Sequence, residues 1–204
     1  MMDNTTIRVR ITFQEKILGT APANEEVYRD FIASKAPDAK STEDEIEALG
    51  VDAVVEKGMT VFPRDADGNP ILWDYQIKGF FKDACGMLAR IGKAGKGNES
   101  SKLKVYKKII DGLIFPQPRQ IVLHSPGGIG VCQRPLRAQT PRGERVALAM
   151  SEELPAGTWC DVDIILMQED LFPAIIEWLD YGAFRGIGQW RNSGCGRFTY
   201  DVID

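Results

Sequence analysis

The residues best suited to bind a ligand lie near the carboxyl end, in the segment 186–197 (GIGQWRNSGCGR). Its glycines lack a Cβ and so let the backbone come close to a flat or charged group, and successive N–H groups of such a loop can hold an anion. Arg185, Arg191 and Arg197 can pair with phosphates, and Trp190 can stack on a base. The segment therefore predicts contact with a phosphate-bearing ligand; a structural turn between a helix and an edge strand is the alternative.

A second candidate is the band of cations in the middle of the chain. Residues 90–145 carry 12 Lys/Arg and 3 Asp/Glu, or +9, whereas residues 1–89 sum to −6 and residues 146–204 to −7, for a total of −4. Cations in or beside loops containing Gly and Pro suit a polyanion that is recognised by its backbone; a solvated basic loop without a partner is the alternative. The candidates in this band are Lys93, Lys96, Lys102, Lys104, Lys107, Lys108, Arg134, Arg137, Arg142 and Arg145, and Lys78 and Lys82 just before it are added to them; Arg90 lies on the margin of the same predicted helix as Lys78 and Lys82.

Neither glycine-rich segment matches a nucleotide-binding fingerprint. A G-x-G-x-x-G pattern starting at Gly186 would need glycine at position 191, which is Arg. In GKAGKG (92–97), Asn98 stands where a P-loop has Lys. The sequence thus favours binding of a polyanion over binding of a dinucleotide or a nucleoside triphosphate.

Catalytic and metal chemistry have little support in the sequence. His124 is the only histidine; it could be the general base of a metal-independent ribonuclease, but no paired acid lies nearby in sequence, and a structural role is favoured. The four cysteines are scattered without a C-x-x-C, so we expect neither a disulfide framework nor a zinc site. No cofactor or metal is expected.

No apolar run approaches the roughly 18 residues of a membrane span, and the segment MMDNTTIRVRITF does not have the pattern of a secretory signal. We therefore expect a cytoplasmic protein that does not bind membranes.

The elements that must position these residues follow from hydrophobic periodicity. Residues 7–13 alternate apolar and polar types, which predicts a strand with one wet face. Residues 76–90 repeat apolar types at helical spacing, as do residues 170–184, where Pro173 suits a first turn. Further expectations are helices within 24–49, a hairpin over 59–75, a mobile loop over 92–101, and strands at 106–115, 119–124, 145–149, 158–167 and 197–203.

This order predicts an α+β fold, with a ferredoxin-like or RRM-like antiparallel sheet packed by helices and with irregular basic loop insertions. We expect a single domain over 1–204, with an extra helical insertion at 24–50 and a mobile basic loop at 92–104.

Three features resemble the RAMP superfamily, the RRM-like proteins that form subunits of CRISPR RNA-guided complexes. YQIKGFFKDACGMLAR resembles the stretch in which a strand end enters a helix through a Lys-Gly pair, here Lys78-Gly79. DYGAFRGIGQWRNSGCGRF resembles the carboxyl-terminal glycine-rich loop of that family, and the order of elements around an irregular basic insertion is similar. The matching loop residues are Gly186, Gly188, Gly194, Gly196 and Arg197.

The resemblance implies an RRM-like fold and RNA contact through the glycine-rich loop and the neighbouring basic loops; it does not imply catalysis. We therefore expect a non-enzymatic protein that binds RNA or a nucleotide polyanion, with other subunits of a ribonucleoprotein or a second copy as further partners. Two alternatives stay open: a protein-interaction module or anti-defence mimic from a mobile element, which docks on other subunits or on a defence complex through its acidic segments, and a metal-independent ribonuclease.

Overall fold

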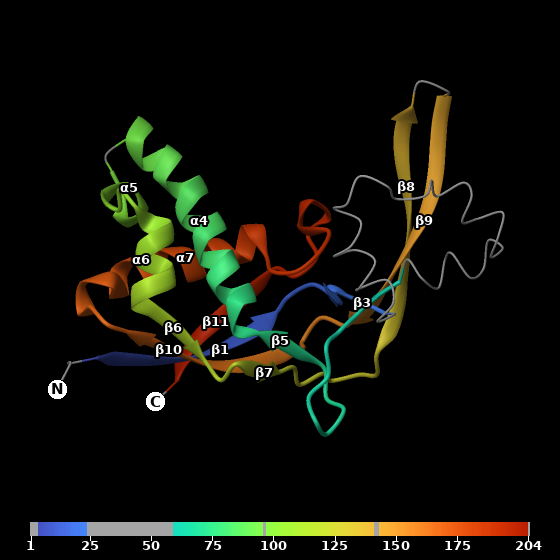
Figure 1. Cartoon of the computed structure of the whole chain (residues 1–204), viewed down its shortest axis with the longest axis horizontal. Coiled ribbons are helices and arrows are strands. Elements are labelled where there is room, and N and C mark those ends of the chain that lie inside the picture. The colour runs from blue at the N-terminus through green and yellow to red at the C-terminus, as the bar shows by residue number, and fades with distance from the viewer. Residues whose placement is uncertain (1–3, 24–58, 96, 141–142, 204) are drawn as a thin grey trace, which may run out of the picture. The chain divides into compact units, whose positions relative to one another are not determined.

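The computed structural model describes residues 4–23, 59–95, 97–140 and 143–203 (Figure 1). They group into two compact units. Unit 1 comprises Met1–Ile17, Arg64–Gly128 and Leu154–Asp204, and unit 2 comprises Leu18–Pro63 and Ile129–Glu153. The single domain expected from the sequence stays a prediction, and the helices expected within 24–50 lie outside the described residues.

Unit 1 is built on a four-stranded antiparallel sheet with the strand order β11-β1-β10-β6. The helices α4 and α7 connect these strands, so the chain order is β1-α4-β6-β10-α7-β11. This is the βαββαβ arrangement of a ferredoxin-like fold, which confirms the predicted fold class. The bounds are β1 Thr5–Phe13, α4 Asp74–Ala94, β6 Ile114–Gln117, β10 Trp159–Leu166, α7 Phe172–Arg185 and β11 Phe198–Ile203.

The core of unit 1 lies between the sheet and the helices that cover one of its faces (Figure 1). In β1, alternate apolar side chains from Ile7 to Phe13 point into this core, while Arg8 and Arg10 lie on the opposite face. That opposite face, which α4 and α7 do not cover, is called the open face below.

The helix α4 confirms the prediction for residues 76–90 and extends it at both ends. Its Gln76 side chain accepts a hydrogen bond from the Trp73 N–H at 2.8 Å, which satisfies a donor at the helix start. Phe81 packs against Trp178 of α7 with ring centroids 5.5 Å apart, and both side chains are fully buried. Burial of such aromatic rings dominates the energetics of a core of this size.

Two short helices lie where the sequence predicted other structure. The helix α5 (Glu99–Lys102) falls within the segment expected to be a loop, because the side chain of Asn98 caps it by accepting from the Ser101 N–H at 2.9 Å. The helix α6 (Tyr106–Leu113) replaces most of the strand expected over 106–115, and only β6 is extended. The strand prediction for 106–113 is therefore wrong.

The hairpin expected over 59–75 forms only at its turn, where Arg64 and Pro70 make an isolated bridge. The strand β5 (Ile71–Trp73) pairs with β7 (Gln120–Val122) instead. Two single 3₁₀ turns, Glu169–Leu171 and Arg191–Ser193, complete unit 1.

Unit 2 is dominated by a long two-stranded hairpin. The strands β8 (Gly130–Thr140) and β9 (Gly143–Leu154) pair from one end to the other. Short strands flank β9, and the Phe62 N–H donates to Glu152 Oε2 at 2.8 Å. The strands beside β9 are β2 (Ile17–Leu18) and β4 (Thr60–Val61), and β3 (Ala21–Pro22) pairs with the other side of β4. Among the residues that the structure describes, no helix has the length and apolar character that crossing a membrane requires.

Candidate nucleic-acid interface

Two neighbouring residues of α4, Lys82 and Asp83, bind the structures that flank this helix. Lys82 Nζ forms an ion pair with Asp111 Oδ1 of α6 at 2.5 Å. Asp83 Oδ2 accepts from Arg185 Nε at 2.7 Å and from Arg191 Nη1 at 2.8 Å. The outer surface of α4 is thus bounded by α6 on one side and by the end of α7 with the glycine-rich loop (residues 186–197) on the other.

The electrostatics of Asp83 make it an anchor for that loop. Burial raises the pKa of Asp83, but the hydrogen bond from Arg185 and the charge of Arg191 lower it by more, so the pKa lies below its usual value. The hydrogen bond with Asp83 in turn raises the pKa of Arg185. Two of the three arginines proposed to bind phosphate therefore already hold a carboxylate, and Arg197 is left exposed.

The glycine-rich loop is also held by its own backbone. The Ile187 N–H donates to the Gly196 carbonyl at 2.9 Å, and the Gly196 N–H donates to the Lys16 carbonyl at 2.8 Å. Gly186 and Gly196 both have φ of +73°, and a Cβ on Gly196 would collide with the Ile187 carbonyl oxygen. At these two positions the backbone conformation itself requires glycine. This agrees with the alternative given above, in which the segment forms a structural turn.

Gly188 and Gly194 also have positive φ, and Trp190 adopts a left-handed conformation (φ 55°) with 39% of its surface exposed. Its ring is therefore not part of the hydrophobic core.

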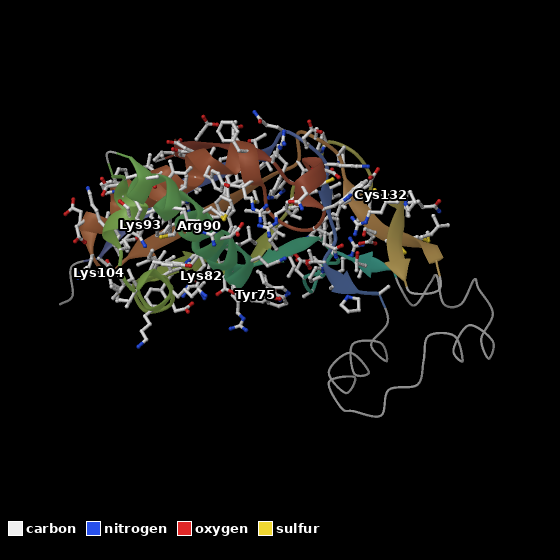
Figure 2. The ribbon with its side chains drawn as sticks, turned by 90° about the horizontal axis from the view of Figure 1, so that it is seen from above. Tyr75, Lys82, Arg90, Lys93, Lys104 and Cys132 are labelled. Carbon is white, nitrogen blue, oxygen red and sulfur yellow. The ribbon has the colours of Figure 1, made fainter. Side chains whose placement is uncertain are left out.

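Around the outer surface of α4 lies a group of cations that is called the cationic face here. All are exposed, and the structure gives none of them an acidic partner among the described residues; Figure 2 labels two of them on α4, Arg90 and Lys93, and a third, Lys104, in the turn before α6. By contrast, Lys102 is paired with Glu99 at 2.6 Å. The cationic face comprises Arg90, Lys93, Lys104, Lys107 and Lys108.

The Lys78-Gly79 pair lies on α4 one turn before Lys82. Lys78 Nζ donates to the Asp111 carbonyl at 3.1 Å and lies 4.5 Å from the Phe115 ring centroid, and burial lowers the pKa of Lys78. Gly79 is exposed, and a Cβ there would meet nothing within 4 Å. Lys78 therefore helps to hold α6 and β6 against α4, whereas nothing within the described part of the chain explains a glycine at position 79.

Most of the predicted site residues belong to unit 1. Arg134 and Arg137 lie on β8 in unit 2, where Arg134 is buried at 9% exposure. Lys96 lies outside the described residues. The predicted residues in unit 1 are Lys78, Lys82, Lys93, Lys102, Lys104, Arg185, Gly186, Gly188, Trp190, Arg191, Gly194, Gly196 and Arg197.

His124 lies elsewhere. Its ring stacks on Trp159 at 4.2 Å between centroids, and the Arg10 guanidinium lies 4.0 Å from the Trp159 ring. Asp161 lies close to this cluster, and the hydrogen bond from Arg10 is the main cause of its lowered pKa. Sequence reasoning missed this acid because it lies 37 positions further along the chain. Arg10 binds both carboxylate oxygens of Asp161, at 2.7 and 2.8 Å.

No protein-family model matches the chain, and no curated protein matches it. Among solved structures, a chain of a Type III-B Cmr-beta complex bound to cognate target RNA matches with a TM-score of 0.58 at 12% identity, over 98% of this chain and 60% of that one. A chain of a Type IV-B CRISPR complex matches with a TM-score of 0.54 at 12% identity, over 98% of this chain and 90% of that one.

Cmr6 from Pyrococcus furiosus is less similar, with a TM-score of 0.45 at 13% identity over 99% of this chain and 100% of that one. Of the Type III-B chain described above, this chain covers only 60% of the length. The resemblance predicted from the sequence is confirmed at the level of the fold: the chain shares its fold with these chains of two CRISPR complexes.

Proposed function

We propose that this protein is a non-enzymatic RNA-binding subunit of a CRISPR-type ribonucleoprotein complex, and that it binds RNA phosphates with its cationic face. The observation that carries the proposal is that Arg90, Lys93, Lys104, Lys107 and Lys108 are exposed without acidic partners in the described chain. Cations in this state can exchange counterions for phosphates without first breaking an internal ion pair. The fold shared with subunits of RNA-containing CRISPR complexes supports RNA as the polyanion.

Gly79 supports the same placement of the RNA. Glycine inside a helix costs about 0.5–1 kcal/mol relative to alanine, and the open space at this position offers no packing reason for it. The absence of a side chain lets a phosphate backbone lie close to α4 between Lys82 and the glycine-rich loop. Trp190, at the other border of this surface, would stack on an unpaired base.

The contacts of the cations indicate which of them hold the structure together and which can bind RNA. Arg185 and Arg191 position the glycine-rich loop through Asp83, and Lys78 packs α6 against α4. The residues of the cationic face would then supply the attraction for RNA, and Arg197 would add to it from the loop.

The test is a salt titration of the affinity for a fluorescent single-stranded RNA, measured by anisotropy. Neutralising Lys104, Lys107 and Lys108 together removes three phosphate contacts, so the slope of log K against log salt should flatten by about 2. Arg119→Ala is the matched control, because Arg119 is exposed on the turn between β6 and β7 and lies 5.8 Å from the Trp73 ring. An unchanged slope in the triple variant, or an equal loss in the control, would contradict the proposal.

A ribonuclease would behave differently in the same experiment. The bound RNA should stay intact during incubation, and His124→Ala should leave both affinity and RNA length unchanged. Cleavage that disappears in the His124→Ala protein would replace the non-enzymatic proposal with the metal-independent ribonuclease.

A further inference from the structure

The two edges of the unit 1 sheet are protected to different degrees. The edge strand β6 contains Pro116 and is followed by Pro118, and proline has no N–H with which to pair another strand. The opposite edge strand, β11, has the sequence FTYDVI, which contains no proline, lysine or arginine. In the described part of the chain no strand pairs with the outer edge of β11. An edge of this kind is a template for a further strand.

Charges on the open face indicate what side chain such a strand would carry. Asp201 of β11 lies opposite Arg10 of β1, which lies opposite Asp161 of β10. The Arg10 guanidinium is turned toward Asp161, to which it donates two hydrogen bonds at 2.7 and 2.8 Å. Asp201 is exposed and attracts Arg10 only through space. A cation on an added strand, opposite Asp201, would continue the alternation of charge across the sheet.

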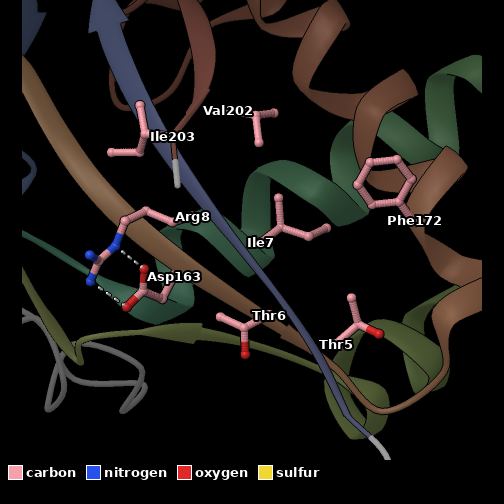
Figure 3. Close-up of a pocket in the computed structure, with 8 residues that line it drawn as sticks. All are labelled: Thr5, Thr6, Ile7, Arg8, Asp163, Phe172, Val202 and Ile203. Atoms are coloured by element: carbon pink, nitrogen blue, oxygen red, sulfur yellow. Dashed lines mark hydrogen bonds and ion pairs between the residues drawn. The ribbon is translucent and has the colours of Figure 1, made fainter.

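The neighbouring position of β11 offers an apolar site on the other face. A pocket of about 500 Å³ lies at the end of β11 and β1, and Ile7, Phe172 and Val202 line its helical side (Figure 3). Val202 is 55% exposed and Phe172 is 39% exposed although both are large apolar residues. Because successive residues of a strand point to opposite faces, a strand with a cation opposite Asp201 places its next side chain beside Val202.

We propose that β11 receives an extended segment of another protein by strand addition, and that this segment carries a lysine or arginine opposite Asp201 and an apolar residue beside Val202. A second copy of this chain does not fit the description, because FTYDVI has no cation to offer Asp201. Main-chain hydrogen bonds would supply affinity and the alternate side chains would supply specificity. This protein-docking edge is independent of the proposed RNA interface.

The probes for the test are two capped hexapeptides, TVKVTV and TVEVTV. They are titrated to millimolar concentration into the full chain while backbone amide shifts are followed by nuclear magnetic resonance. We expect TVKVTV to shift the amides of residues 198–203 and to bind about two- to fivefold more tightly than TVEVTV, the range expected for a cross-strand ion pair. Asp201→Lys should reverse this preference, and Asp201→Asn should abolish it. Asp67→Lys, which makes the same charge change at an exposed turn, should preserve it.

Three results would overturn the inference: shifts absent from residues 198–203, a preference unaltered by both Asp201 variants, or self-association through β11 seen by light scattering. RNA affinity measured on the Asp201→Asn protein separates the two proposals, because it should equal that of the parent protein whether or not the peptides bind.

Discussion

Replacing Asp83 with asparagine tests whether one carboxylate holds the glycine-rich loop on α4. The change keeps the shape of the side chain but removes the charge that Arg185 and Arg191 share at 2.7 and 2.8 Å. Hydrogen bonds to charged groups contribute about 1.5–3 kcal/mol each, and the three side chains are only 28–30% exposed, so solvent replaces part of the loss. We expect the free energy of unfolding to fall by about 2 kcal/mol, which lowers Tm by about 4–8 °C in a chain of this size.

The measurement combines urea unfolding with hydrogen exchange. Exchange should accelerate in the glycine-rich loop and at the end of α7 and remain unchanged in β1 and β10. Asp67→Asn is the control, since an exposed turn carboxylate should change stability by less than about 0.5 kcal/mol. Unaltered protection of the loop in the Asp83→Asn protein would refute the anchoring role.

The same anchor has a defined pH dependence. Because the two arginines hold the pKa of Asp83 below its unfolded value, its contribution is complete above the unfolded pKa of about 3.9 and is lost as the pH falls through the folded pKa. The difference in unfolding free energy between the parent protein and the Asp83→Asn variant should be constant from pH 7 to about pH 5 and shrink below about pH 4. A difference that grows on acidification would contradict this assignment.

Three further substitutions test local packing by thermal unfolding. Gly79→Ala should raise the free energy of unfolding by about 0.5–1 kcal/mol, because a Cβ meets nothing there; a loss would show a hidden contact. Gly196→Ala should lower it by more than about 2 kcal/mol, since φ is +73° and the Ile187 carbonyl occupies the space; a neutral result would mean that the loop is loosely packed. Ser100→Ala should cost about 1–3 kcal/mol, because it removes the acceptor for the buried Trp178 Nε1 at 2.9 Å; a cost below 0.5 kcal/mol, on the order of a surface change, would contradict it.

The ferredoxin-like framework could be predicted because its elements carry strong local patterns. Alternation in β1 and helical spacing in α4 and α7 mark one buried face each, and burial decides the structure there. The helix α6 was missed because its two adjacent isoleucines and the Ile114-Phe115 pair that follows are residue types typical of strands. Ile109, Ile110 and Leu113 instead fall on one helical face, with Ile110 fully buried. Tertiary packing overrode local propensity in this segment.

The residue types of the candidate site could be predicted from the sequence, but the contacts between them could not. The arginines of the glycine-rich loop stand out by type, yet the residue that binds two of them, Asp83, lies 102 and 108 positions away from them in sequence. An acidic residue on an amphipathic helix gives no local sign that it has such partners. Likewise, which lysines are paired with acids and which are exposed depends on how α6 lies against α4, and spacing along the chain does not contain that information.

The division of the chain into two units determines how it would respond to limited proteolysis. Unit 2 is formed from two insertions, 18–63 and 129–153, so four peptide bonds link it to unit 1. A nick in either insertion leaves the other insertion joined at both of its ends. A nick in the first also leaves β1 hydrogen-bonded between β10 and β11 of the other fragment. Such a clipped protein would migrate as one species under native conditions and separate into two chains only in denaturant.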